Sequence, residues 1–163
     1  MSSTSKFDKQ EDEKCDSSCY INPAYYCNVK QAENSPRLEG LKFVQFKLPN
    51  SEQHQYLDVG CGPGNFTKDF LLKIASPCRR IVGVDRADAM VEHAREHSSD
   101  PSISYERLDI ELDDPQPLVD KYGHFDRAYS FMVLQCVRDL GRAYRNLFHL
   151  LKEGGECALL YVA

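Results

Sequence analysis

The sequence has no tryptophan, no long apolar run and no excess of basic residues among its 163 residues. A helix that spans a bilayer needs about 20 apolar residues, so we expect no membrane segment. A nucleic-acid-binding face needs a basic surplus, whereas the net charge is −5, so we expect no nucleic-acid partner. The opening residues MSSTSKFDKQ lack the apolar core of a signal peptide, and we therefore expect a cytoplasmic protein.

The sequence also lacks a Cys-x-x-Cys pair, although it contains seven cysteines. In a chain without a signal peptide, an odd and scattered set predicts free thiols rather than a disulfide framework. Cys15 and Cys19, together with Cys27, resemble half of a metal site. No second pair of ligands at a suitable spacing completes that site, so we expect no bound metal.

The length suits a single domain. Residues 1–20 are polar and charged, which predicts a disordered tail. Residues 21–50 predict one or two short helices interrupted near Pro36. Residues 51–163, in which apolar runs alternate with helical patterns, are expected to form the main α/β domain.

The most informative stretch is QYLDVGCGPGN at residues 55–65, where an apolar strand over residues 56–59 leads into three alternate glycines. An amphipathic helix pattern follows, with apolar residues at Phe66, Phe70, Leu71 and Ile74. Glycine lets the backbone approach a ligand closely, and the helix start offers free N–H groups. The next expected strand, residues 81–84, ends in Asp85, where a ribose-binding carboxylate belongs. These features together predict a nucleotide site.

The glycine spacing indicates which nucleotide is bound. Gly60, Gly62 and Gly64 follow Gly-x-Gly-x-Gly, whereas a dinucleotide fingerprint is Gly-x-Gly-x-x-Gly. Asp58 lies two residues before the first glycine, and Asp-x-Gly-x-Gly-x-Gly resembles motif I of class I methyltransferases, which use S-adenosylmethionine. An acid at this point attracts an ammonium group and repels a pyrophosphate. An NAD-dependent oxidoreductase is therefore a distant alternative.

Strand and helix patterns alternate through the rest of the chain. Further strands are expected at residues 81–84, 103–108, 126–131 and 156–163. We expect one helix with Asp88 as its N-cap, and another capped by Asp139 and stopped by Gly154 and Gly155. The acidic residues 111–120 predict mainly a solvated loop. The alternation predicts a Rossmann-like, doubly wound, mainly parallel sheet with ligands at the carboxyl ends of its strands.

Several segments are similar to juvenile hormone acid O-methyltransferases of arthropods. They are LDVGCGPGN at 57–65, VGVD at 82–85 with Met90 and Val91, LDI at 108–110, FD at 125–126 and GGE at 154–156. The segments SFMVLQCV at 130–137 and NVKQ at 28–31 point to this family in particular. The resemblance covers about residues 26–163. It implies S-adenosylmethionine-dependent O-methylation of a small lipophilic carboxylic acid.

The resemblance also implies roles for individual residues. The expected cofactor-binding residues are Asp58, Gly60, Cys61, Gly62, Gly64, Asp85, Arg86, Met90, Asp109, Ile110 and Ser130. Gln31, Gln135 and Cys136 are expected to face the acceptor, near the helical segment 21–50. We expect no catalytic acid or base, because a sulfonium methyl group is already electrophilic and a carboxylic acid is already ionised at neutral pH.

Two departures from the family pattern bear on the substrate and on the length. Gln135 and Cys136 stand where His-Trp is typical, so an aromatic wall and an indole N–H are missing. The class I sheet usually has seven strands, and we expect this one to end after its fifth, as in a fragment of a longer protein. A truncated or non-catalytic S-adenosylmethionine-binding module is therefore the alternative to an active enzyme.

Two smaller patterns have alternative interpretations. His93-x-x-Glu96-His97 matches a zinc-protease pattern, but no further acidic ligand is evident, so we interpret it as a solvated helix face. Cys61 lies near a helix N-terminus that could lower its pKa. The other interpretation of Cys61 is a small side chain that fits the turn.

Overall fold

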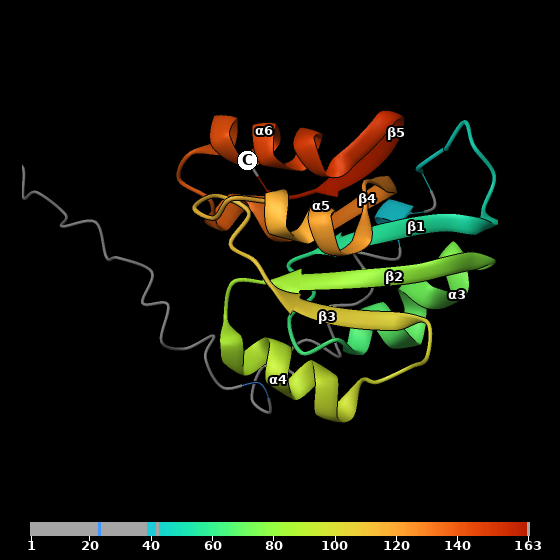
Figure 1. Ribbon diagram of the computed structural model, residues 1–163, viewed down its shortest axis with the longest axis horizontal. Coiled ribbons are helices and arrows are strands. Elements are labelled where there is room, and N and C mark those ends of the chain that lie inside the picture. Colours follow the sequence, from blue (N-terminus) through green and yellow to red (C-terminus); the bar gives the residue numbers. More distant parts are fainter. Residues whose placement is uncertain (1–22, 24–38, 42, 163) are drawn as a thin grey trace, which may run out of the picture.

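The computed structural model describes residue 23, residues 39–41 and residues 43–162 of the chain (Figure 1). The tail expected over residues 1–20, the interruption at Pro36 and the expected acceptor-side residue Gln31 lie outside the described residues.

Five strands form one sheet, and every neighbouring pair of strands is parallel. The strands are β1 (Ser51–Val59), β2 (Cys78–Asp85), β3 (Ile103–Arg107), β4 (Phe125–Phe131) and β5 (Leu151–Leu160). Their order across the sheet is β3-β2-β1-β4-β5. The chain therefore winds outward from β1 to β3 and then continues on the other side of β1, which confirms the expected doubly wound α/β sheet.

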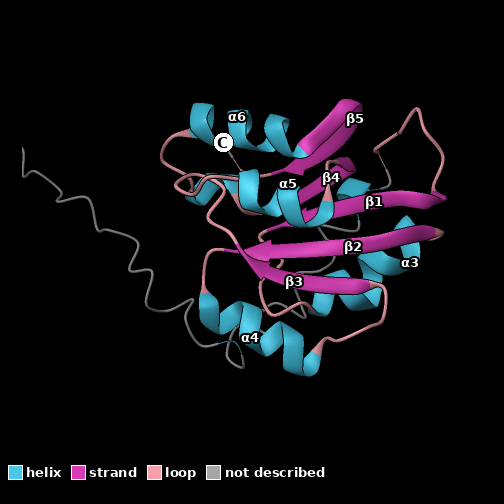
Figure 2. Ribbon diagram, in the orientation of Figure 1, coloured by secondary structure: helices cyan, strands magenta, loops and turns pink. Residues whose placement is uncertain are grey.

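Helices cover both faces of this sheet (Figures 1 and 2). One face carries η2 (Thr67–Leu71), α3 (Leu72–Ala75) and α4 (Asp88–His97). The other carries α5 (Gln116–Tyr122) and α6 (Leu140–Leu150), while the short 3-10 turn η3 (Leu134–Cys136) follows β4. Among the described residues, no helix is both long enough and apolar enough to cross a membrane.

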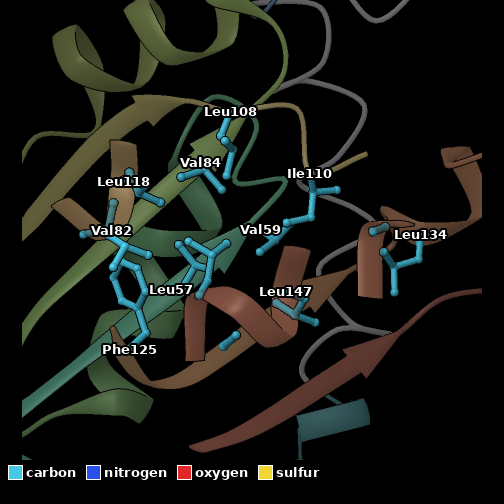
Figure 3. Packing of buried hydrophobic residues seen from close by; sticks show 14 residues of the cluster. Leu57, Val59, Val82, Val84, Leu108, Ile110, Leu118, Phe125, Leu134 and Leu147 are labelled. Atoms are coloured by element: carbon cyan, nitrogen blue, oxygen red, sulfur yellow. The ribbon is translucent and has the colours of Figure 1, made fainter. Parts of the chain in front are cut away.

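The core has two apolar layers, one on each side of the sheet. Leu57 and Val82 belong to the layer under α5 and α6, which Figure 3 shows from close by. Tyr56 and Ile81, the preceding residues on the same two strands, belong to the layer under α3 and α4. All four side chains are fully buried, as expected for central strands of a parallel sheet that is covered on both faces.

Arg127, near the amino end of β4, holds the segment that leads into β1. Its guanidinium carbon lies 3.5 Å from the centre of the Phe46 ring. The same group donates hydrogen bonds to Leu48 O (2.7 Å), to Asn50 Oδ1 (3.0 Å) and to a Glu156 carboxylate oxygen (3.3 Å). We call these five residues the arginine clasp. Since Arg127 is only 2% exposed, the clasp is part of the buried structure.

We call residues 60–64 the glycine turn. The helix that follows it differs from the expected one by a single widened turn. In η2 the hydrogen bond runs from Leu72 N–H to Thr67 O, five residues apart, so this turn is a π-helix. The extra residue shifts the helix phase for everything after it. Ala75 is therefore fully buried, and Ile74, expected on the apolar face, is 43% exposed.

The expected N-cap of α4 is wrong. The N-cap residue is Ala87, and no side chain caps the helix there. The Asp85 carboxylate accepts the N–H of this N-cap residue at 3.0 Å, while Asp88 is already the first residue of the helix. In contrast, Asp139 caps α6 as expected, because its carboxylate accepts the Arg142 N–H.

The acidic stretch over residues 111–120 is less of a loop than expected, because α5 begins inside it. Two prolines suggested irregular structure, but Pro115 is the N-cap residue and Pro117 lies in the first turn, where proline is tolerated. Leu118 and Val119 provide the apolar face, at 7% and 9% exposure.

The expected end of α6 at Gly154 is also wrong. The helix ends at Leu150, and Leu151 already has extended backbone and pairs with Phe125 of β4. The register between β4 and β5 then shifts before Arg127, and Gly154 lies in this irregular part with a φ of +74°. The two glycines thus belong to a strand irregularity rather than to a helix cap.

Candidate functional site

The expected site lies where the strand order reverses. β1 and β4 are neighbours, and their connections leave in opposite directions across the sheet. The carboxyl ends of these two strands carry the glycine turn after Val59 and the segment after Phe131. In open α/β sheets this is where ligands bind.

The glycine turn is held against β2 by backbone hydrogen bonds. Val84 O accepts the N–H groups of Gly60 at 2.7 Å and of Cys61 at 3.0 Å. Gly62 N–H then donates to an Asp85 carboxylate oxygen at 2.9 Å. The turn and the end of β2 therefore form one unit, and the expected pairing of the glycine motif with the acid of the next strand is present in space.

Glycine is required at the first position of the turn for two reasons. Gly60 has a φ of +75°, which side-chain-bearing residues rarely adopt. A Cβ atom there would also lie 2.1 Å from Val133 Cγ2. The segment after β4 thus packs directly onto the glycine turn, a contact that no spacing in the sequence indicated.

Asp85 lies at the carboxyl end of β2, and each of its two carboxylate oxygens accepts one backbone N–H. The donors are Gly62 at 2.9 Å and Ala87 at 3.0 Å. Burial raises the pKa of this carboxyl above its ordinary value, although the two N–H groups and the nearby Arg86 oppose the rise. A carboxylate oxygen has room for a second hydrogen bond, so the orientation of Asp85 is fixed while acceptor capacity remains.

Asp58, two residues before the turn, is buried and bonded to the helix that follows the turn. Its side chain is 3% exposed, and its carboxylate accepts the Thr67 hydroxyl at 2.6 Å. Thr67 is fully buried at the start of the π turn, and sequence reasoning missed it because a lone threonine in a helix carries no pattern.

The pKa of the Cys61 thiol depends on burial and on the charges near the turn. Burial raises its pKa well above the ordinary value, and the negative charges of Asp58 and Asp85 raise it further. The suggestion of a thiol activated by a helix N-terminus is therefore wrong for this site, because burial and two carboxylates outweigh that effect. The side chain is 5% exposed and fills space in the turn, as the other interpretation held.

Two further side chains hold the far end of the turn. Ser98 Oγ donates to Pro63 O at 2.9 Å, and Tyr105 Oη lies 3.3 Å from Gly64 O and 3.0 Å from Ser98 O. Ser98 follows α4 and Tyr105 belongs to β3, so both are distant from the turn in the sequence. No sequence pattern indicated either contact.

The loop after β3 carries two of the expected cofactor residues. Asp109 accepts the N–H groups of Glu111 at 2.9 Å and Leu112 at 3.2 Å through one carboxylate oxygen. Ile110 is 6% exposed and belongs to the core layer that contains Val59 and Leu134, as Figure 3 shows. The structure therefore brings this loop to the same end of the sheet as the glycine turn.

The remaining expected cofactor residues differ in exposure. Arg86 is exposed just beyond Asp85, whereas Met90 in α4 is 4% exposed. Ser130, the penultimate residue of β4, is 1% exposed, and its hydroxyl has no hydrogen-bond partner among the described residues.

The segment after β4 has an uncommon backbone. Met132 has a φ of +59° although it is not a glycine, and its N–H donates to Leu160 O at 2.6 Å. Gln135 and Cys136 follow on η3, and both are exposed. A non-glycine residue in the left-handed region beside a candidate site is a feature often associated with function.

Two other features lie apart from this site. Surface hollows of about 260 Å³ and 660 Å³ lie beside the β3 edge and over α6, and neither is lined by residues of the glycine turn. His93 and His97 stack with ring centres 4.1 Å apart on α4. Within the described part of the chain, no group of three or more His, Cys, Asp or Glu side chains could hold a metal ion.

Curated proteins similar to this chain include two enzymes named for acid substrates. The juvenile hormone acid O-methyltransferase of Bombyx mori is 40% identical over 108 residues, which cover 65% of this chain and 37% of that protein. The trans-aconitate 2-methyltransferase of Variovorax paradoxus (strain S110) is 33% identical over 138 residues, which cover 85% of this chain and 48% of that protein. The chain thus spans less than half the length of these two relatives.

Solved structures share the fold. The complex of the Haloferax volcanii Trm112 methyltransferase activator with a methyltransferase matches at a TM-score of 0.59 and 20% identity, covering 83% of this chain and 58% of that one. The methyltransferase CalH in complex with SAH matches at a TM-score of 0.54 and 22% identity, covering 64% and 30%.

The family description "Methyltransferase domain" matches residues 57–159, from the strand before the glycine turn to the last strand of the sheet. The match covers more than half of the chain and runs from the last residues of β1 to the penultimate residue of β5. The chain belongs to this methyltransferase domain family.

Proposed function

We propose that the chain binds S-adenosylmethionine at the glycine turn and serves as the cofactor-binding part of an enzyme that methylates a small carboxylic acid. The observation that carries this proposal is a pair of carboxylates at the glycine turn: Asp85 accepts the Gly62 N–H, and Asp58, two residues before Gly60, accepts the Thr67 hydroxyl. Burial raises the pKa of the nearby Cys61 thiol, and the negative charges of Asp58 and Asp85 raise it further.

This field distinguishes two kinds of nucleotide. S-adenosylmethionine carries a sulfonium and an ammonium group, and both gain from nearby carboxylates. The pyrophosphate of NAD is anionic and would be repelled. The electrostatics of the turn therefore agree with the glycine spacing in favouring the methyl donor.

The residues present fit this cofactor. Asp85 would accept the ribose hydroxyls, because its two oxygens are already oriented by Gly62 and Ala87. Asp58 would attract the ammonium group, and Asp109 and Ile110 would border the adenine. Arg86, Met90 and Ser130 complete the proposed set at the edges of the site.

Bound S-adenosylmethionine supplies an electrophilic methyl group. An acceptor carboxylic acid is ionised at neutral pH, so this chain needs no general base. The contribution of the protein is to orient the reacting groups and to exclude water, and misplacement by about 1 Å costs on the order of a hundredfold in rate. We propose that Gln135 and Cys136 face the acceptor, because both are exposed and they follow Val133, which packs on Gly60.

The substrate class rests on the relatives. The similar proteins of Bombyx mori and Variovorax paradoxus are named for juvenile hormone acid and trans-aconitate, and both names denote carboxylic acids. A lipophilic acid is favoured by the Bombyx mori relative, whose identity to this chain is the higher of the two.

Titration calorimetry tests the cofactor. We expect S-adenosylhomocysteine to bind more tightly than NAD, and tighter binding of NAD would reject the methyltransferase assignment. Transfer of a radiolabelled methyl group to farnesoic acid and to trans-aconitate tests the acceptor. It should be measured on this chain and on a chain extended with the C-terminal part of the Bombyx mori relative. Labelling of neither acid by the extended chain would reject the proposed substrate class.

A further inference from the structure

Glu111 connects two parts of the proposed site that are distant in the sequence. It lies in the loop after β3, directly after Ile110, which is on the proposed adenine side. Its carboxylate accepts the Asp139 N–H at 2.8 Å and the Arg138 N–H at 3.2 Å. These two residues end the segment that contains η3 and begin α6. One side chain thus connects the loop after β3, on the proposed adenine side, with the segment that contains Gln135 and Cys136, on the proposed acceptor side.

Other contacts make this bridge rigid on the adenine side. Glu111 N–H donates to Asp109, so the backbone that carries the bridging carboxylate is fixed by a proposed cofactor residue. Asn146 Nδ2 donates to Ile110 O at 2.9 Å, and an Arg142 guanidinium nitrogen donates to Leu112 O at 2.7 Å. The loop is therefore tied to α6 at three successive residues.

The acceptor-side segment, residues 132–138, is held at its two ends and exposed between them. At one end Met132 bonds to Leu160 O, and Val133 packs on Gly60. At the other end Glu111 holds Arg138 and Asp139. Between them Leu134 is buried at 3% exposure and Val137 packs against the same core layer, so Gln135 and Cys136 are the exposed part between the two ends.

We propose that Glu111 is a positioning residue that makes the conformation of the acceptor-side segment depend on occupancy of the adenine side. This inference rests on the proposed function. Ligand contact with Asp109 and Ile110 further stabilises the loop in this position, and Glu111 transmits that stabilisation to residues 135–139. The acceptor side would then be fully formed only when the methyl donor is in place.

Hydrogen–deuterium exchange with S-adenosylhomocysteine as the probe tests the proposal. In the unaltered chain, the ligand should slow exchange both at residues 60–64 and at residues 135–139. We expect at least about a fivefold effect at the second region, the low end of typical coupling between sites. In Glu111→Ala the effect at residues 60–64 should remain and the effect at residues 135–139 should be lost. Glu153→Ala removes an exposed glutamate and should behave as the unaltered chain.

The ligand-dependent difference is the readout, because loss of a purely structural hydrogen bond would speed exchange equally with and without ligand. Equal slowing at residues 135–139 in Glu111→Ala and the unaltered chain would overturn the proposal, as would no slowing there in the unaltered chain. No slowing at residues 60–64 would instead reject cofactor binding itself. If Glu111→Ala fails to fold, Glu111→Gln retains one acceptor oxygen and should show an intermediate loss.

Discussion

Each end of the sheet holds a charged side chain away from bulk water, and the two side chains differ in how fully their hydrogen-bonding groups are used. At the amino end, Arg127 is surrounded by Phe46, Leu48, Asn50 and Glu156. At the carboxyl end, each oxygen of Asp85 accepts a single backbone N–H, and burial raises the pKa of its carboxyl. Arg127 has its charge matched by a carboxylate and its donors largely used, whereas Asp85 keeps acceptor capacity. We infer that the arginine clasp serves stability and that Asp85 serves binding.

The largest effect should come from breaking the arginine clasp. Arg127→Ala should lower the free energy of unfolding by about 3–5 kcal/mol, because it removes a buried group packed on Phe46 and leaves Leu48 O and Asn50 Oδ1 without their donor. Denaturant unfolding measures this change. Arg79→Ala, an exposed arginine at the start of β2, should change stability by no more than about 0.5 kcal/mol. Equal effects of the two substitutions would contradict a structural role for the clasp.

The next effect concerns packing in the glycine turn. Gly60→Ala should destabilise the fold by about 2–3 kcal/mol, because it adds backbone strain and drives a Cβ into Val133. Gly154→Ala is the matched control, since Gly154 has a similar φ of +74° and no atom within 4 Å of the added Cβ. Strain alone predicts about 1 kcal/mol there. Thermal or denaturant unfolding of both variants isolates the cost of the Val133 contact. An identical loss of stability in both would show that Val133 moves aside at no cost.

Asp85 should behave in the opposite way to Arg127. Asp85→Ala should weaken binding of S-adenosylhomocysteine by about 1.5–3 kcal/mol, the range for hydrogen bonds to a charged group. Its effect on the free energy of unfolding should be smaller than that of Arg127→Ala, because a desolvated carboxylate is removed with its two hydrogen bonds. Calorimetry gives the affinity, and Asp88→Ala, an exposed acid three residues on, should leave it unchanged. An unaltered affinity in folded Asp85→Ala would place the ribose acceptor elsewhere.

The smallest effect is the pH dependence of stability, which should differ in sign between the two ends. Burial raises the pKa of Asp85, so its contribution to stability is present below its ordinary pKa and is lost as the pH rises through the raised value. For Glu156, burial also raises the pKa, but the Lys47 and Leu48 N–H groups and Arg127 outweigh it, so the pKa is lowered. Its contribution is present above its ordinary pKa and is lost as the pH falls through the lowered value.

Urea unfolding from neutral pH down to about pH 3.5 checks both signs. As the pH falls, the unaltered chain should gain stability relative to Asp85→Asn and lose stability relative to Glu156→Gln. The same trend in both comparisons would mean that one of the two carboxylates does not have the environment described.

Local patterns were enough to predict the sheet and the positions of Gly60 and Asp85 in it. Apolar strands followed by glycines or acids place Gly60 and Asp85 at the same edge of a parallel sheet, whatever the details of packing. The ends of elements were less predictable. The N-cap of α4 was misjudged because the helix begins one residue earlier than expected, with Ala87 as the N-cap residue and no side-chain cap.

Contacts between distant segments were not predictable from one sequence. The bond from Lys47 N–H to Glu156 spans 109 residues, and that from Asp139 N–H to Glu111 spans 28. A glutamate in a polar stretch looks the same whether it caps a distant helix or faces solvent. The contact between Val133 and Gly60 could not be predicted either, because it depends on how closely two segments distant in the sequence approach each other.

The π turn after the glycine motif has a consequence for changes in chain length. It holds one residue more than a regular helix needs, so deletion of the exposed Asp69 would allow an unbroken α-helix while Leu71 and Ala75 keep their spacing. The residues before the deletion would then rotate by about 100° relative to the core. Thr67 would leave the Asp58 carboxylate, which it now contacts at 2.6 Å. Phe66, which is 5% exposed and packs on Phe131, would be turned away from the core as well. A one-residue deletion here should therefore disturb the core and the glycine turn together.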